Sequence, residues 1–378
     1  MKPILKKSKL ILAISSALFI AQLSLPTVHA MELSDTVEDA IMHNPEFREQ
    51  IKAHQGIQAD LEGAEGSWYP VIDLGIGIGL EEIERDNQAK TSLTRSEANI
   101  RLTENLFEGF GTENEIERQQ ARLDAAGYTA HARANQIAID MVSAYINLLK
   151  EQELRALAEE NQKTHERILD QITQRTEAGI GNQVEVDQAK ARLALANSNL
   201  RAGYNNYNDS LSRFQRVLGR MPDNDLIEPS IDFEFPETLE EAINIALLEH
   251  PTLRSANADI AEARAQHRSA ARFYYPRVDL ELEKTFDHNI NGIEGKNHNF
   301  QAMLRLKYNL YNGGKDSADR DRTASAVQQA AEIRNNSRRQ TIENLRYAWD
   351  ARQYIGEQLV FVKQHIKLTH ETLEGYRK

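Results

Sequence analysis

The sequence predicts a mainly α-helical chain with transmembrane β-strands, arranged as two tandem copies of an α-β-β-α unit. Three observations support this fold class. The two halves of the chain share landmarks at a nearly constant spacing. Four short segments alternate apolar and polar residues, and long stretches without proline carry coiled-coil spacing. Together they indicate long helices attached to a small sheet.

The first 30 residues predict a secretory signal peptide. Four lysines precede an apolar run from Leu10 to Leu25, and Val28-His29-Ala30 supplies the small residues of a cleavage site. A membrane anchor needs about 20 apolar residues, and Pro26 ends this run too early. We therefore expect export and a mature chain that begins near Met31.

Composition narrows the possible functions. The net charge is −12 and residues 1–30 contain four lysines and no acid, so the mature chain is more acidic still. Such a charge argues against a nucleic-acid partner. There is no cysteine, and hence no disulfide, thiol metal ligand or cysteine-linked lipid anchor. A mean hydropathy of −0.58 argues against a helix-bundle membrane protein.

An internal repeat organises the chain. Tyr69-Pro70 aligns with Tyr275-Pro276, and Asn105-Leu106-Phe107-Glu108-Gly109 aligns with Asn309-Leu310-Tyr311-Asn312-Gly313. Two copies of one supersecondary plan explain this best. We expect a first repeat at 31–218, a proline-rich linker at 219–237 and a second repeat at 238–378.

Each copy should open with a helix and continue with a β-hairpin. The helical pattern of the second copy runs from Thr238 to Ala271, and an aromatic-proline pair then ends it. Hairpins are predicted at 71–106 and 277–310. Gly75, Gly77 and Gly79 lie on the non-apolar face of the first strand, and the apolar alternation continues through them. They lack the spacing of a dinucleotide-binding turn.

The strands have the character of a membrane barrel wall. One face is predicted to contact lipid, through Ile72, Leu74, Ile76, Ile78, Leu304 and Leu306. Aromatics at the open ends of the hairpins suit a membrane interface: Trp68, Tyr69, Phe107, Tyr274, Tyr275 and Tyr311. A half-buried soluble sheet shows the same alternation, but the signal peptide and the aromatic ends favour the membrane. Four strands cannot close a barrel and lipid tolerates no open edge, so copies must combine their strands.

Long helices should leave the sheet on one side. Thr112 to Glu177 contains no proline and would form a helix of about 100 Å. A turn near 179–184 reverses the chain. The return segment carries an apolar seam with steps of three and four residues: Val186, Ala189, Leu193, Ala196, Leu200, Gly203 and Tyr207.

These features resemble the TolC family of outer-membrane export ducts. The resemblance rests on the tandem repeats, the Tyr-Pro pairs and the tip Arg175-x3-Gly179-x5-Glu185-Val186-x2-Ala189. Where Glu185 stands, the family usually has Asp. The resemblance implies a homotrimer whose strands form one twelve-stranded barrel in outer-membrane lipid, with a helical tunnel in the periplasm. It also implies docking to a periplasmic adaptor and an inner-membrane transporter through Arg175, Gly179, Gly181, Glu185, Val186 and Ala189.

The resemblance also guides the choice within the family. Phe-Glu-Gly-Phe-Gly at the start of the long helix is similar to members that serve type I protein secretion, and a multidrug efflux duct is the alternative. The second copy stops at Lys378, before a counterpart of Gly179. By the family pattern its tip, gating residues and return helix would follow, so we expect a fragment or an interrupted gene and a chain that does not form a working duct alone.

Enzymatic readings find little support. His370-Glu371 lacks the second histidine of a zinc-protease motif, and a surface helix explains it better. We expect no catalytic residues, cofactor or metal. A periplasmic coiled-coil adaptor or scaffold is the rival of another class, and it would explain the helical hairpin but not two aromatic-ended strand pairs.

Overall fold

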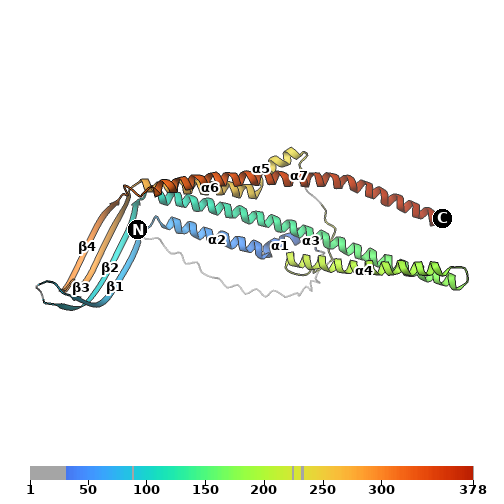
Figure 1. The fold of residues 1–378 in the computed structure, drawn as a ribbon, viewed down its shortest axis with the longest axis horizontal. Helices are drawn as coiled ribbons and strands as arrows, with labels where there is room; N and C mark the ends of the chain where they lie inside the picture. Colours follow the sequence, from blue (N-terminus) through green and yellow to red (C-terminus); the bar gives the residue numbers. More distant parts are fainter. Residues whose placement is uncertain (1–30, 87–88, 224, 231–233, 378) are drawn as a thin grey trace, which may run out of the picture.

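The computed structural model describes residues 31–86, 89–223, 225–230 and 234–377. The predicted signal peptide at 1–30 and part of the predicted linker lie outside the described residues. The described chain is elongated, with a sheet at one end and all the long helices extending from the same end of that sheet (Figure 1).

The two repeats have parallel element orders. The first contains α1 (Leu33–His43), α2 (Pro45–Gly66), β1 (Val71–Ile83), β2 (Thr91–Phe107), α3 (Gly111–Glu177) and α4 (Gln183–Leu218). The second contains α5 (Leu239–Glu249), α6 (Pro251–Ala270), the 3₁₀ turn η1 (Ala271–Tyr274), β3 (Arg277–Ile290), β4 (Ile293–Lys307) and α7 (Lys315–Arg377). The predicted fold class, mainly helical with tandem α-β repeats, is confirmed.

Two details of the sequence prediction were wrong. The pattern from Thr238 to Ala271 forms two main helices rather than one, because His250 before Pro251 is extended, with ψ of 122°. In the first repeat, Asn44 before Pro45 separates α1 from α2 in the same way, with ψ of 127°. The hairpin was also predicted to continue to Leu310, because the alternation of apolar residues does, but β4 ends at Lys307.

The four strands form one antiparallel sheet in the order β1-β2-β3-β4. One row across the sheet pairs Ile76 with Ala98, Ala98 with Phe286 and Phe286 with His298. Because neighbouring residues of a strand point to opposite faces, this row fixes which residues share a face. Among the described residues, β1 and β4 are the edges and each has only one strand neighbour.

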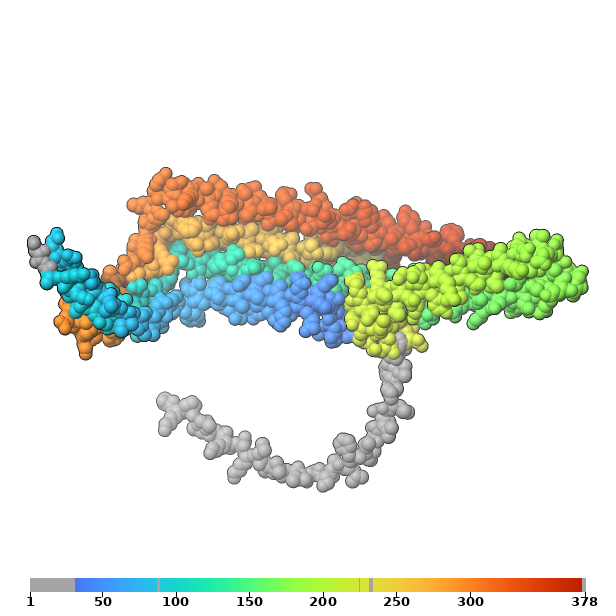
Figure 2. Space-filling view, turned by 60° about the horizontal axis from the view of Figure 1, so that its bottom comes forward, coloured from blue at the N-terminus to red at the C-terminus, as the bar shows by residue number. Residues whose placement is uncertain are grey.

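The helices form a layer that continues the sheet. α2 packs on α3, α3 on α6 and α6 on α7, and Figure 2 shows them as adjacent bands from blue α2 to orange-red α7. Each of these helices is joined in the chain to one strand: α2 to β1, α3 to β2, α6 to β3 and α7 to β4. The strands therefore lie in the same order as the helices. The sheet and the helices therefore make one continuous wall.

A compact core lies where α1, α3 and α4 meet, and its buried members include Met141, Leu148 and Phe214. Tyr145 is fully buried there, and its hydroxyl lies 2.7 Å from the carbonyl oxygen of Met31 and accepts the N–H of Ile227 at 2.9 Å. Burial raises the pKa of this hydroxyl. Tyr145 thus ties the start of the described chain and the linker to the middle of the long helix.

Candidate membrane sheet, junction and helical tip

One face of the sheet is apolar and exposed. Ile72, Leu74, Ile76 and Ile78 keep 66–82% of their surface exposed, and Leu304 and Leu306 keep 67% and 64%. Water disfavours such a stripe by roughly 25 cal/mol for each Å². The predicted lipid-facing residues therefore lie together on one side of the sheet, and this side needs an apolar neighbour.

The opposite face is polar and internally paired. Arg101 donates to Glu283 at 2.8 Å, and Arg305 donates through two nitrogens to Glu281 at 2.9 Å each. Asp279 is only 3% exposed and accepts from Arg277 and Asn105, both at 2.9 Å. Charges arranged this way suit a wet interior rather than a hydrocarbon surface.

The glycines of β1 make room for this polar layer. A Cβ at Gly75 would lie 2.2 Å from Oδ1 of Asn99, and one at Gly77 would lie 2.9 Å from Oε1 of Glu97. Both glycines lie within a regular strand and lead into no helix. Their role is to let side chains of β2 cross the neighbouring strand, so the structure contains no nucleotide-binding turn here.

The junction between sheet and helices is closely packed. Phe107, Phe110 and Tyr275 meet edge to face, with ring centroids 5.6–6.3 Å apart. Gly109 has φ of +67°, and a Cβ there would lie 2.7 Å from Cβ of Tyr275, so only glycine fits between strand and helix. Of the predicted interface aromatics, the structure brings Phe107 and Tyr275 together. Trp68, Tyr69, Tyr274 and Tyr311 are exposed.

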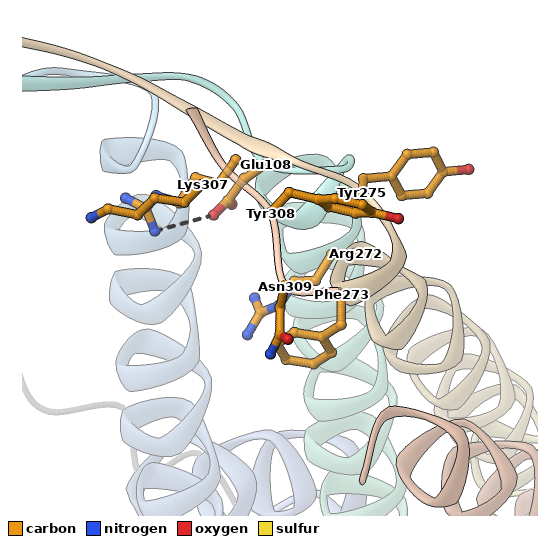
Figure 3. Close-up of a pocket in the computed structure, with 8 residues that line it drawn as sticks. Glu108, Arg272, Phe273, Tyr275, Lys307, Tyr308 and Asn309 are labelled. Atoms are coloured by element: carbon orange, nitrogen blue, oxygen red, sulfur yellow. Dashed lines mark ion pairs between the residues drawn. The ribbon is translucent and has the colours of Figure 1, made fainter. Parts of the chain in front are cut away.

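A cavity of about 500 Å³ lies on the polar side of the junction. Arg272, Lys307 and Glu108 line it with Tyr308 and Asn309 (Figure 3). The Glu108 carboxylate lies 3.9 Å from Arg277, which enters the same cavity. The cavity therefore presents mixed charge where the sheet meets the helical wall, with cations in excess.

The helical tip forms a tight turn between α3 and α4. Gly179 has φ of +81°, and its N–H donates to the carbonyl oxygen of Thr176 at 3.0 Å. A Cβ at Gly181 would lie 2.3 Å from Oγ1 and 2.9 Å from Cα of Thr176. Asn182 then starts α4 by accepting the N–H of Val184 at 3.0 Å. Glycine is thus favoured at 179 by the positive φ and at 181 by the close approach of Thr176.

The structure corrects part of the predicted docking seam. Val186 and Ala189 are only 4% and 6% exposed. They lie inside the α3–α4 hairpin, because small residues at steps of three and four let the two helices of one chain pack together. Arg175 and Glu185 are exposed, and the exposed apolar side chains at the tip are Ile180 and Val184, at 72% and 69%. Sequence reasoning missed these two, although an apolar residue within the Gly-x-Gly turn and another just after it were a usable signal.

No described helix has an apolar stretch long enough to span a membrane. No three histidine or acidic side chains in the described residues group as metal ligands would.

Comparisons with known proteins agree with this arrangement. The sequence model of a family described as outer membrane efflux protein matches residues 36–220 and 242–378. The chain is 22% identical over 290 residues to Protein CyaE of Bordetella pertussis, covering 75% of this chain and 61% of that protein. It is 22% identical over 226 residues to outer membrane efflux protein BepC of Brucella suis, covering 60% and 49%. With outer membrane protein TolC of Escherichia coli it shares 21% identity over 253 residues, covering 66% and 51%. The chain thus spans about half of the curated relatives it matches, or somewhat more.

Solved structures establish the fold. A structure of CusC superimposes with a TM-score of 0.79 at 15% identity, covering 92% of this chain and 81% of that one. The open state of the MtrE outer membrane channel of Neisseria gonorrhoeae gives a TM-score of 0.74 at 14% identity, covering 86% and 74%. At these identities the likeness concerns architecture alone.

Proposed function

Because the chain belongs to the outer membrane efflux protein family, we propose that it is a subunit of an outer-membrane channel. The channel passes substrates from the periplasm to the exterior. This membership places the chain in a transport family rather than in an enzyme class. One observation carries the proposal: a four-stranded sheet with an exposed apolar face and two open edges continues directly into a helical wall.

The open edges support an oligomer, and the family suggests a homotrimer. A membrane sheet must close, since unpaired backbone groups are costly in lipid. Pairing β4 of one copy with β1 of the next would remove both edges. The paired polar face would then line the pore, and the exposed apolar face would meet outer-membrane lipid. The helical wall, which leaves one end of the sheet, would enclose a tunnel in the periplasm.

The tip supports docking to a periplasmic partner. It lies at the far end of the helices from the sheet (Figure 1), where an inner-membrane transporter and its adaptor would be reached. Arg175, Gly179, Gly181 and Glu185 shape this end, and Ile180 and Val184 present exposed apolar surface. We assign the contact to these side chains and no longer to Val186 and Ala189.

Within the family, the sequence around the junction favours type I protein secretion. The turn from Phe107 to Gly111 packs its rings against Tyr275, and its Phe-Glu-Gly-Phe-Gly sequence resembles that branch. The absence of cysteine argues against a lipid-anchored efflux duct. Multidrug efflux is the alternative.

Complementation separates these functions. The chain is expressed in a strain that lacks its own outer-membrane duct, both as it stands and in an extended form. The extended form carries a second tip and return helix, copied from the first repeat and fused after Lys378. Two outputs are measured: secretion of a type I cargo protein and resistance to efflux-pump dyes.

We expect both forms in the outer-membrane fraction, and we expect cargo secretion rather than dye resistance wherever function is restored. Restored dye resistance alone would move the assignment to efflux. A chain found only as soluble periplasmic protein would contradict the channel.

A further inference from the structure

Two lysines and two histidines lie on the apolar face of the sheet at its loop end. Val278, Leu280 and Leu282 share that face of β3, and Lys284 and His288 follow them on the same face. On β4 the same face carries Leu306, Leu304, Ala302 and Phe300, followed by His298 and Lys296. We call Lys284, His288, Lys296 and His298 the outer cationic patch.

The sheet register draws the patch together. His288 pairs directly with Lys296, so their Cα atoms are about 5 Å apart. His298 pairs with Phe286, and these two rings meet at 5.4 Å. The ammonium group of Lys284 lies 5.5 Å from the centre of the same Phe286 ring. Phe286 therefore contacts both Lys284 and His298.

The lysines of the patch differ from the arginines of the sheet because they have no acidic partners. Arg95, Arg101, Arg277 and Arg305 of the polar face each form an ion pair. Within the described part of the chain, no carboxylate lies within 4.0 Å of Lys284 or Lys296. Glu283 and Asp287 are neighbours of the patch in sequence, but they lie on the opposite, polar face. The exposed Glu294 of β4 lies two residues before Lys296, and Glu82 of β1 is engaged by Lys90. Unpaired cations beside an apolar band call for an external anion.

The sheet register also lets the patch reach the level of lipid headgroups. In one row of the sheet, Ile78 of β1 is apolar, Ser96 follows on β2, and His288 and Lys296 stand at the far end. Strands of membrane barrels tilt by about 35–45°. A row across them therefore runs obliquely and can begin in hydrocarbon and end among headgroups. The long side chain of Lys284 can extend its ammonium group to the same level.

We propose that the outer cationic patch binds the phosphate groups of phosphorylated lipid in the leaflet at the loop end of the sheet. The inference rests on the proposed function, because that function places this face in a membrane. Two lysines and two protonatable imidazoles on adjacent strands supply several donors for one phosphate, and bonds from charged donors are stronger than neutral ones. Such lipid would fix the tilt and depth of β3 and β4.

Binding of a defined lipid tests the proposal. The probe is diphosphorylated lipid A in detergent, compared with its dephosphorylated form, and bound lipid is counted by native mass spectrometry of the purified full chain. The test variant is Lys284→Gln combined with Lys296→Gln. Lys307→Gln is the matched control, since it removes a lysine from the polar face at the other end of the sheet. Circular dichroism and outer-membrane fractionation check that each variant folds and inserts.

We expect the double variant to bind diphosphorylated lipid A at least about tenfold more weakly, with the control variant unchanged. Equal binding of phosphorylated and dephosphorylated lipid by an inserted chain would overturn the patch while leaving the channel intact. Displacement of the lipid by an equal concentration of inorganic phosphate would overturn the lipid assignment. A chain that does not fractionate with the outer membrane would contradict the proposed function, and the lipid site with it.

Discussion

Gly75 and Asn99 show how single residues shape the polar face of the sheet. The Asn99 amide occupies the space above Gly75 and donates to Glu283 on the next strand at 3.2 Å. Alternation along β1 predicted that its glycines face away from the apolar side, but not that they accommodate particular neighbours. Such contacts depend on register between strands far apart in sequence, and periodicity does not report register.

We predict that Gly75→Ala destabilises the sheet. The new Cβ must displace the Asn99 amide and break its bond to Glu283. Gly79→Ala is the matched control, because no heavy atom lies within 4 Å of a Cβ there. The temperature at which the purified protein loses its β-sheet signal in circular dichroism should fall for Gly75→Ala and hold for Gly79→Ala. Equal melting of both variants would contradict this role.

Glu115 makes stability depend on pH near the junction. The Arg118 guanidinium donates to both of its carboxylate oxygens and holds the pKa of this carboxyl below its usual range. A lowered folded-state pKa adds stability above the unfolded-state pKa of about 4.3, and that stability is lost as the pH falls through the folded value. Arg118 also contacts Glu262, at 3.1 Å, and so links α3 to α6.

Glu115→Gln should therefore lower the free energy of unfolding at pH 7 by less than about 1 kcal/mol, since the pair is partly exposed. The difference from wild type should shrink as the pH falls through the folded-state pKa of Glu115. Urea unfolding curves at several pH values measure it. A difference that is independent of pH would show that the substitution acts through packing rather than through charge.

At the scale of elements, the sequence predicted well what depends on local periodicity. Strand alternation placed Ile72 and Leu304 on the exposed apolar face, and the proline-free run after Thr112 is the long helix α3. The same reasoning misjudged Val186 and Ala189. An apolar seam shows that a helix packs against something, but the partner can be another helix of the same chain, as it is here.

We predict that Ile76→Arg prevents insertion of the sheet. Ile76 lies in the middle of the exposed apolar face, and a cation at mid-membrane costs about 2–4 kcal/mol. The control is Thr285→Arg, which places the same charge on the polar face between Glu283 and Asp287. The yield of protein in the outer-membrane fraction should fall sharply for the first variant alone. Normal yield of Ile76→Arg would argue that this face does not meet lipid.

The tip should tolerate no side chain at Gly181. Gly181→Ala pushes a methyl group against backbone atoms of Thr176 and must reshape the turn. Gly179→Val forces a β-branched residue to positive φ, at a cost of about 1–2 kcal/mol. Gly203→Ala in α4 is the control, since its Cβ would make only ordinary contacts at 3.7 and 3.8 Å.

Cargo secretion by the extended form measures the effect of these tip variants. It should drop several-fold for Gly181→Ala and Gly179→Val while the outer-membrane yield stays normal, and Gly203→Ala should secrete normally. Full secretion by both tip variants would remove the tip from the docking model.

At the scale of the molecule, the sheet and the helical layer form one wall because their orders coincide. Neighbouring strands lead into neighbouring helices from α2 to α7. The internal repeat predicted two similar units, yet their side-by-side arrangement could not be read from either unit. It depends on contacts such as that of Phe107 with Tyr275, which join the first repeat to the second within one chain.

The central claim is that β4 of one subunit pairs with β1 of the next subunit to close a trimeric barrel. The chain has no cysteine, so any disulfide between subunits must come from the introduced cysteines. Ile76→Cys on β1 is combined in turn with Phe300→Cys, Ala302→Cys or Leu304→Cys on β4. Within one subunit, β2 and β3 lie between β1 and β4. The β1 and β4 positions are therefore too far apart for a disulfide, which needs Cα atoms about 4.4–6.8 Å apart.

Oxidation of outer-membrane fractions, followed by denaturing electrophoresis without reductant, is the most direct measurement. We expect strong cross-linking for one β4 position, with a ladder that stops at three copies and collapses to one on reduction. Membrane-inserted protein that cross-links at none of these β4 positions, or a ladder that stops at two copies or continues past three, would contradict the shared barrel.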